Sequence, residues 1–230
     1  MSKKIAVVQS NYIPWRGYFD LINSVDEFIL YDDVQYTRRD WRNRNAIKCP
    51  HGLLWLSIPV QIKGKYLQKI RDTVVADKKW AHDHWRSIVH NYSKAPYFSE
   101  FRERFEELYL GPEEKFLSQI NFRFITAICR ILGITTTIGW STDYQLTGDK
   151  TERLLNLCQQ AGATSYLSGP TAKAYLEEEL FSRQGVEVSY FDYSRYGEYH
   201  QLYPPFEFHV SIIDLIFNEG PDAARFMLSF

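Results

Sequence analysis

The sequence predicts an α/β fold in which a parallel-rich sheet is flanked by helices. Ile5 to Val8 is a short, β-branched, apolar run of the kind that forms a buried strand. A segment with helical spacing, Gly17 to Ser24, separates it from a second apolar run, Phe28 to Tyr31. Strand, helix and strand in this order form a βαβ unit, whose two strands are parallel. The same alternation resumes after Gly133 and extends the α/β pattern toward the C-terminus.

The segment from Lys78 to Leu132 follows a helical pattern instead. Apolar side chains recur there at helical spacing in three consecutive stretches. We interpret residues 78–132 as a helical subdomain within one domain that spans residues 1–230. Before this segment, Trp55 to Val60 is expected to form an edge strand, because Pro59 cannot donate a hydrogen bond to a neighbouring strand.

The C-terminal part predicts three further strands and two helices. The strands are expected at residues 134–140, 165–167 and 186–191, and the helices at residues 152–161 and 211–218. Gly162 and Gly220 follow the predicted ends of the two helices, where glycine is common. Ser211 and Asp214 have the spacing of a capping box at the start of the last helix.

The composition argues against several classes of partner. The chain has 27 lysines and arginines against 28 acidic residues, so no long-range field favours nucleic acid or an anionic membrane. Aromatic residues make up 16% of the chain, which is high and indicates either a large core or a stacking site. The oligomeric state is left open, including a homo-oligomer.

The cysteines and the N-terminus indicate a cytoplasmic location. Cys49, Cys129 and Cys158 form no CxxC pair, which fits a reducing compartment and disfavours a structural zinc site. The first apolar run is too short for a secretory signal, and no apolar stretch reaches the ~20 residues of a membrane span. His82 and His84 would not share a helix face, so we expect solvated histidines and no metal site.

The loop after the first strand is a candidate binding site. In open α/β sheets, ligands bind at the carboxyl ends of the strands, which is where residues 9–19 are expected. The amides of Gln9 and Asn11 are difficult to explain as packing and are predicted to bind substrate. Tyr12 and Trp15 are also predicted ligands, although packing beneath the loop is the more common role for a single aromatic side chain.

A second polar segment follows the second strand. Asp32 and Asp33 are candidate catalytic bases, and Gln35 is a candidate substrate ligand. Neighbouring residues on an extended chain point apart, so at most one carboxylate should face the site, and Asp33 fits a solvated turn equally well. We predict that residues 9–17 and 32–45 converge on one pocket, because both loops follow parallel strands.

The densest cationic stretch of the chain lies within the second loop. Guanidinium groups bind phosphate through paired hydrogen bonds, and an aromatic ring can stack on a base or a sugar. A nucleotide or nucleotide-sugar diphosphate would satisfy both, whereas a solvated basic loop is the alternative. At least one arginine of the stretch is expected to bind the diphosphate. The predicted ligands here are Arg39, Trp41, Arg42, Asn43, Arg44, Asn45 and Lys48.

A weaker signal lies between Ser168 and Tyr175. This segment is expected to open a helix from a strand end, where free backbone N–H groups attract an anion. Gly169 would let the ligand approach the backbone, and Ser168 would bind it, unless Ser168 only caps the helix. The sequence contains no GxGxxG, GxxxxGK[ST] or GxSxG pattern.

Several motifs together resemble the WbqC-like family. They include Tyr12-Ile13-Pro14-Trp15, Gly17-Tyr18-Phe19, Asp32-Asp33-Val34-Gln35-Tyr36, Trp41-Arg42-Asn43-Arg44-Asn45, Lys94-Ala95-Pro96-Tyr97-Phe98 and Tyr166-Leu167-Ser168-Gly169. These motifs are specific in combination, and the resemblance covers nearly the whole chain. One departure is Ser10, where the family pattern has proline.

The resemblance implies an enzyme of bacterial surface-polysaccharide synthesis, of the O-antigen and lipopolysaccharide type. It implies an N-acyl or aminoacyl transferase that acts on the amine of a nucleotide-linked amino sugar, with acyl-CoA or an activated amino acid as donor. In that reaction Asp32 is the preferred base, because a position at the end of a buried strand raises a carboxyl pKa. Asp33 is the second choice.

Two alternatives remain beside the transferase. A more distant architectural similarity, to nucleotidylyltransferase-type Rossmann-like ligases, suggests an ATP-dependent ligase that makes the same amide. The HxGH histidines of those ligases are missing between Gln9 and Gly17, which counts against it. A non-catalytic nucleotide-sugar binding module is the other alternative, and the concentration of Asp, Gln, Arg and Trp side chains at one predicted pocket counts against that.

Overall fold

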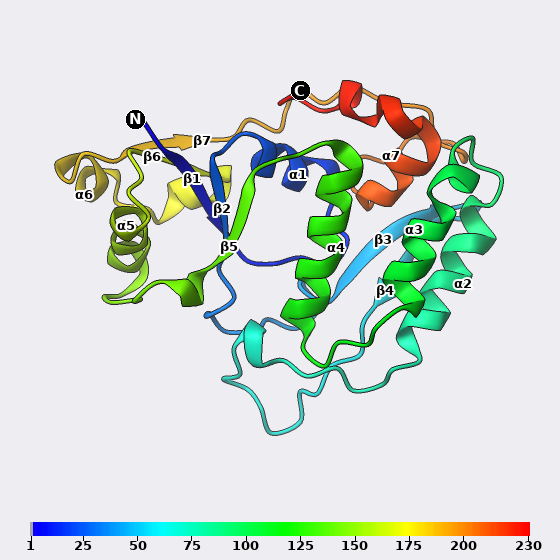
Figure 1. The fold of residues 1–230 in the computed structure, drawn as a ribbon, viewed down its shortest axis with the longest axis horizontal. Coiled ribbons are helices and arrows are strands. Elements are labelled where there is room, and N and C mark those ends of the chain that lie inside the picture. Colours follow the sequence, from blue (N-terminus) through cyan, green and yellow to red (C-terminus); the bar gives the residue numbers. More distant parts are fainter. Residues whose placement is uncertain (1) are drawn as a thin grey trace.

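The computed structural model describes residues 2–230, and a five-stranded parallel sheet forms the core of its left half in Figure 1. The strands are β1 (Lys4–Val8), β2 (Glu27–Leu30), β5 (Thr137–Trp140), β6 (Ser165–Ser168) and β7 (Glu187–Tyr190). Their order across the sheet is β5-β2-β1-β6-β7, and every neighbouring pair is parallel. The predicted α/β fold is therefore confirmed, including the βαβ unit at the N-terminus.

The sheet is covered by helices on both faces, which explains its apolar strands. Ile5 and Val7 of β1 point into one cluster of buried side chains, whereas Ala6 points into the other. A strand that is buried on both faces needs apolar residues at every position, in contrast to the alternation of a half-exposed strand. This requirement explains the continuous apolar run that made β1 recognisable in the sequence.

The covering helices change face halfway along the chain. The helices against one face are α1 (Arg16–Asn23) and α4 (Leu117–Leu132), and those against the other are α5 (Lys150–Gln160) and α6 (Glu178–Arg183). From β1 the chain steps to β2 and β5 in one direction, and then returns across the sheet to β6 and β7. Because such connections are right-handed, the reversal moves the helices to the opposite face. Loops after β1 and β6 therefore diverge, and a crevice opens between them.

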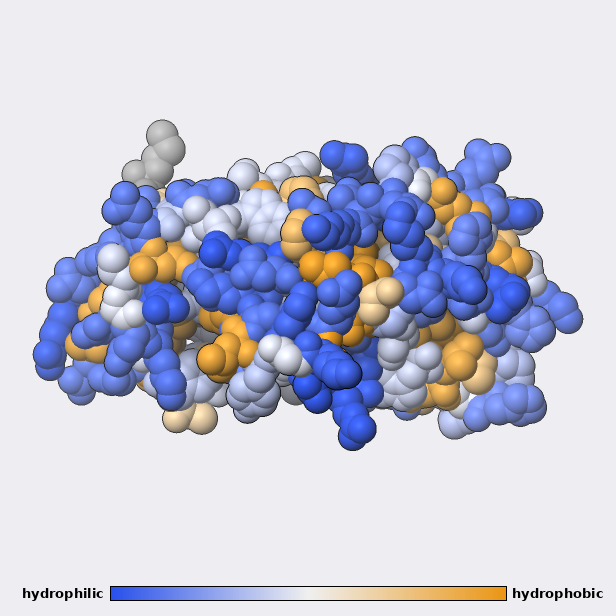
Figure 2. All heavy atoms as spheres, turned by 90° about the horizontal axis from the view of Figure 1, so that it is seen from below, coloured by the Kyte–Doolittle hydropathy of each residue, from blue (hydrophilic) through white to orange (hydrophobic). Residues whose placement is uncertain are grey.

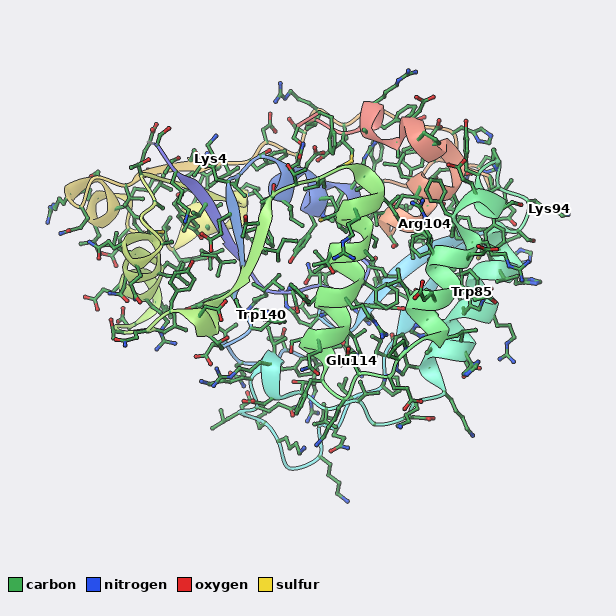
Figure 3. All side chains as sticks on the ribbon, viewed as in Figure 1. Lys4, Trp85, Lys94, Arg104, Glu114 and Trp140 are labelled. Atoms are coloured by element: carbon green, nitrogen blue, oxygen red, sulfur yellow. The ribbon has the colours of Figure 1, made fainter. Side chains whose placement is uncertain are left out.

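A helical region extends beside the sheet and shares its larger core. Its helices are α2 (Trp80–Tyr92), α3 (Phe98–Leu110), α4 and α7 (Ile212–Glu219). Trp85 of α2, labelled in Figure 3, lies beside α3. Its ring stacks on Phe98 and Tyr109 of α3 at ring-centroid distances of 6.1 and 5.9 Å. Phe217 of α7 contacts the Phe98 ring at 5.1 Å. The helices expected between residues 78 and 132 are present, while their description as a subdomain stays an interpretation.

An antiparallel hairpin occupies the second half of the cationic loop and the edge strand that the sequence predicted. β3 (Arg44–Cys49) pairs with β4 (Gly52–Ser57), so the second half of the cationic stretch is a strand. The edge strand expected at residues 55–60 begins earlier, at Gly52, and belongs to this hairpin. Gly52 has a φ of 115°, which lets the chain reverse within two residues.

The remaining helical turns are short. They are η1 (Ile70–Asp72), η2 (Ser141–Asp143), η3 (Pro170–Ala174) and η4 (Gly220–Phe226). The helix expected after Ser168 is thus only a 3₁₀ segment of 5 residues. Within residues 2–230, no helix has the length and apolar character needed to cross a membrane. On the face seen in Figure 2, apolar side chains lie in separate small patches among polar ones.

Candidate functional site

A cavity of about 650 Å³ lies at the carboxyl ends of the parallel strands, at the point where the strand order reverses. We call it the switch-point crevice. Gln9 follows β1, Tyr31 follows β2, and Ser168 ends β6, and all three line the crevice. The first turn of α5 forms another wall, because this helix starts at the same edge of the sheet. Open α/β sheets place their ligands at this position.

The start of α5 places two cationic side chains in the wall of the crevice. Lys150 and Arg153 line it, against one carboxylate, Asp149. The Asp149 side chain makes no capping hydrogen bond to the helix, so it satisfies none of the first backbone N–H groups of α5. The Arg153 guanidinium donates to the Gly148 carbonyl from Nε and a terminal nitrogen, at 3.3 and 3.2 Å. The helix start and its two cations together suit an anionic ligand.

Tyrosine rings form much of the remaining surface of the crevice. Tyr31, Tyr166 and Tyr175 line it, and the side chain of Tyr175 is 59% exposed. Burial raises the pKa of Tyr31, and the neighbouring Arg153 guanidinium opposes that rise. Burial also raises the pKa of Tyr166, so its hydroxyl keeps its proton at neutral pH. The rings offer flat apolar faces next to the cations.

Three residues predicted from the sequence meet in this crevice, namely Gln9, Ser168 and Gly169. A Cβ atom added to Gly169 would have no neighbour within 4 Å, so a ligand can approach the backbone there. The cations and tyrosines of the crevice were missed. Their signal was present in the sequence: the helix that precedes β6 starts at the same sheet edge as the loop after β1, and residues 149–153 form its first turn.

A second, smaller cavity of about 230 Å³ is also lined by residues of the loop after β1. We call it the aromatic cavity. Its lining residues are Asn11, Pro14, Trp15, Trp41, Asn45 and His209. The first two predicted loops therefore do contribute to one cavity, and the Tyr12 N–H donates to the Trp41 carbonyl at 3.0 Å between them. The Trp41 ring lies 5.6 Å from that of Trp55, over which Arg44 is placed at 4.6 Å.

Asp32 lies in a buried polar cluster and lines neither cavity. One carboxylate oxygen accepts the Ser10 N–H at 2.8 Å, whereas Oδ2 has no partner among residues 2–230. Burial raises the pKa of Asp32, and the Arg42 guanidinium opposes the rise. Asp33 points away, as expected of a neighbouring residue, and pairs with Lys69 and Arg71 at 2.9 and 2.8 Å.

The partly buried Arg42 side chain links the two loops through hydrogen bonds. Its guanidinium donates to the Asn11 side-chain oxygen, and burial lowers the Arg42 pKa. Asn121 of α4 donates to the Arg42 carbonyl and to the Ser10 hydroxyl, both at 2.9 Å. Arg42 therefore holds the two loops together and does not itself line the aromatic cavity.

The other predicted ligands have structural contacts or lie on the surface. Tyr12 is fully buried, and its hydroxyl contacts Tyr109 and the Nδ1 of His84, both at 2.9 Å. The expectation of a solvated His84 was wrong, because this side chain lies in the core between α2 and the first loop.

Side-chain amides and amines of the second loop also bind backbone carbonyls. Asn43 donates to Ile58 at 2.8 Å, Gln35 donates to Tyr66 at 2.9 Å, and buried Lys48 donates to Pro205. Arg39 is exposed, and like Arg42 and Arg44 it does not line the switch-point crevice. Within residues 2–230, no three His, Cys, Asp or Glu side chains are grouped as metal ligands would be.

The fold and the crevice define a Rossmann-like α/β protein with a cavity at its topological switch point, where such folds bind ligands. The sequence model of the WbqC-like protein family matches residues 9–226, so the chain belongs to that family. It is 53% identical over 225 residues to the Mycobacterium tuberculosis protein named Uncharacterized protein Rv1507c, covering 98% of this chain and 97% of that protein. No solved structure matches the chain.

Proposed function

We propose that this protein transfers an acyl or aminoacyl group to the amine of a nucleotide-linked amino sugar. The product would serve the synthesis of bacterial surface polysaccharides of the O-antigen type. Two lines of support meet here. The family resemblance implies this substrate class, and the chemistry of the switch-point crevice suits its nucleotide diphosphate.

The observation that carries the substrate class is the combination of cations and tyrosine rings in one crevice. Lys150, Arg153 and the start of α5 suit a diphosphate, because charged donors and free N–H groups bind its oxygens. Tyr31 and Tyr175 offer rings on which a base or a sugar can stack. The volume of about 650 Å³ lies in the range of small-molecule sites.

The transfer step needs an amine that can give up a proton and a donor with an activated carbonyl. Acyl-CoA or an activated amino acid has such a carbonyl, and a base within hydrogen-bond reach would take the proton. Asp32 and Asp33 stay predictions for this base. Asp33 is held in ion pairs with Lys69 and Arg71, and Asp32 is only 1% exposed.

A non-catalytic nucleotide-sugar binding module is the second candidate. It is favoured by the position of Asp32 and Asp33, which line neither cavity. An ATP-dependent ligase on the same substrate is the third. One pair of experiments separates the three.

The first experiment measures binding by calorimetry, with UDP-linked and dTDP-linked amino sugars as probes. Arg153→Gln should weaken binding roughly 10- to 100-fold, because a hydrogen bond to a charged group contributes about 1.5–3 kcal/mol. Arg130→Gln is the matched control, because Arg130 is exposed on α4 and lines neither cavity. Equal affinity in wild type and Arg153→Gln would contradict a diphosphate site in the crevice.

The second experiment follows product formation by mass spectrometry. Each bound sugar is incubated with acetyl-CoA, or with glycine in the presence and absence of ATP. Amide formation from acetyl-CoA supports the transferase, and strict dependence on ATP supports the ligase. Tight binding of the sugar nucleotide without any product would leave the binding module as the function.

A further inference from the structure

The aromatic cavity contains a histidine that the proposed function has not yet used. His209 lies just before α7, where two backbone hydrogen bonds fix the chain. The Ser211 N–H donates to the Ala46 carbonyl of β3, and the Ile212 N–H donates to the Pro14 carbonyl, both at 2.9 Å. The backbone that follows His209 is therefore anchored beside the cavity, which the His209 side chain lines while 78% exposed.

A carboxylate orients this imidazole. Oε1 of Glu207 accepts the His209 backbone N–H at 2.9 Å and lies 3.3 Å from Nδ1 of the ring. Gln201 holds Glu207 in place, because it accepts the Glu207 N–H at 2.8 Å and donates to the Glu207 carbonyl at 2.9 Å. A carboxylate at Nδ1 favours the tautomer with the proton on that nitrogen, which leaves Nε2 able to accept another.

The walls of the cavity suit a sugar ring. Trp15 and Trp41 present aromatic faces, and the Trp15 ring lies 6.5 Å from that of His209. Such faces pack against the apolar face of a sugar. The Asn11 side-chain oxygen is occupied by Arg42, and among residues 2–230 its Nδ2 has no hydrogen-bond partner. This nitrogen can therefore donate to a sugar hydroxyl.

The two cavities are lined by neighbouring residues of one loop. Gln9 lines the switch-point crevice, and Asn11 lines the aromatic cavity. Two residues of extended chain span at most about 7 Å. A nucleotide diphosphate-linked sugar is longer than this. Its nucleotide can occupy the crevice while its sugar lies in the aromatic cavity.

We propose that the sugar amine is placed in the aromatic cavity and that His209 is the catalytic base, with Glu207 as its positioning residue. The inference rests on the proposed transferase function. The neutral amine attacks the carbonyl carbon of an acyl thioester, and a C–N bond forms. The nitrogen gives one proton to Nε2 of His209. The C–S bond breaks, and the leaving thiolate takes that proton, so the products are an amide and a thiol.

The placement of the sugar is tested without any turnover. Trp41→Ala removes an aromatic wall whose side chain is 41% exposed, so the fold should be retained. Calorimetry should show weaker binding of the UDP-linked amino sugar and unchanged binding of UDP. If both ligands bind Trp41→Ala as they bind wild type, the sugar does not lie in this cavity.

The base is tested by steady-state kinetics with the acyl donor that gives product. His209→Gln should lower kcat roughly 10²- to 10⁴-fold with sugar-nucleotide affinity retained, and added imidazole should restore part of the activity of His209→Ala. Glu207→Gln should lower kcat and leave KM unchanged. His200→Gln is the matched control, because His200 is exposed on the same segment and lines neither cavity.

Each outcome decides between the proposals. Wild-type kcat in His209→Gln, with product formed, overturns the assignment of His209 and leaves the transferase intact. Loss of activity in Asp32→Asn alone would return the base role to Asp32. Absence of product from wild type with every donor overturns the transferase itself, and the role of His209 with it.

Discussion

His84 is a single buried side chain that connects the helical region to the loop after β1. It extends from α2, and its Nδ1 lies 2.9 Å from the Tyr12 hydroxyl, which in turn contacts Tyr109. Burial lowers the pKa of His84 to about 4, so the ring is neutral at physiological pH. Tyr12 was predicted as a ligand, but its buried side chain instead binds the loop after β1 to α2 and α3.

The lowered pKa predicts a pH-dependent stability. The unfolded chain binds a proton at His84 below about pH 6.5, whereas the folded protein does so only near pH 4. His84 should therefore contribute fully to the free energy of unfolding above pH 6.5, and this contribution, roughly 3 kcal/mol, should be lost between pH 6.5 and 4. Urea unfolding of wild type and His84→Gln across this range should show a shallower loss in the variant.

The matched control for this measurement is His82→Gln. His82 is exposed two residues away on the same helix, so its replacement should leave the pH dependence of wild type unchanged. Parallel pH profiles for wild type and His84→Gln would show that the buried histidine does not contribute to acid sensitivity.

The β3–β4 hairpin is the element that most changes the interpretation of the sequence. Arg44, Asn45 and Lys48 were predicted as ligands because they are polar and densely spaced. The structure buries Asn45 and Lys48, whose side chains bind carbonyls of Ile13 and Pro205. Those partners come from distant parts of the chain, so no local pattern could reveal them. The apolar runs of β1 and β2 were predictable because their burial follows from composition alone.

The turn of this hairpin gives a prediction at the level of the element. Gly52 has a φ of 115°, and an added Cβ would have no neighbour within 4 Å, so Gly52→Ala introduces backbone strain without a clash. It should destabilise the protein by about 1–3 kcal/mol. Gly169→Ala is the control, because Gly169 has a φ of −73° and an added Cβ there would also have no neighbour within 4 Å. It should change the free energy of unfolding by no more than about 0.5 kcal/mol.

Denaturant unfolding of the two variants beside wild type measures both effects. If Gly52→Ala and Gly169→Ala are equally stable, the turn does not require a left-handed conformation. A stable Gly52→Ala with weakened sugar binding would mean that the hairpin positions Trp41 more than it stabilises the fold.

At the scale of the whole molecule, function depends on where the sheet reverses its strand order. The reversal brings residues 149–153 to the strand end of residue 9, and the C-terminal segment brings His209 to Trp15. The sequence predicted the five strands of the parallel sheet and most helices, because periodicity is local, but it did not predict β3. The contact between residues 149–153 and residue 9 was missed, although both segments were expected at the same edge of the sheet. The contact between His209 and Trp15 was not predictable, because these segments are far apart in the chain and carry no shared motif. Gln9 was predictable because it directly follows a recognisable strand.

The switch-point crevice therefore predicts that a ligand stabilises the whole fold. It joins the ends of β1, β2 and β6 to α5, and a ligand that binds only the folded state at 100 times its Kd adds about 2.7 kcal/mol. For a domain of this size, the melting temperature should rise by roughly 5–10 °C. Thermal unfolding with a UDP-linked amino sugar measures this shift.

Gly169→Val should remove the ligand-induced shift and keep the melting temperature of the free protein. A valine is compatible with the extended backbone at this position, and its side chain would occupy the open space of the crevice. A single-stranded oligonucleotide should give no shift, because the chain has a net charge of −1 and no general attraction for nucleic acid. An equal shift in wild type and Gly169→Val would place the ligand outside the crevice.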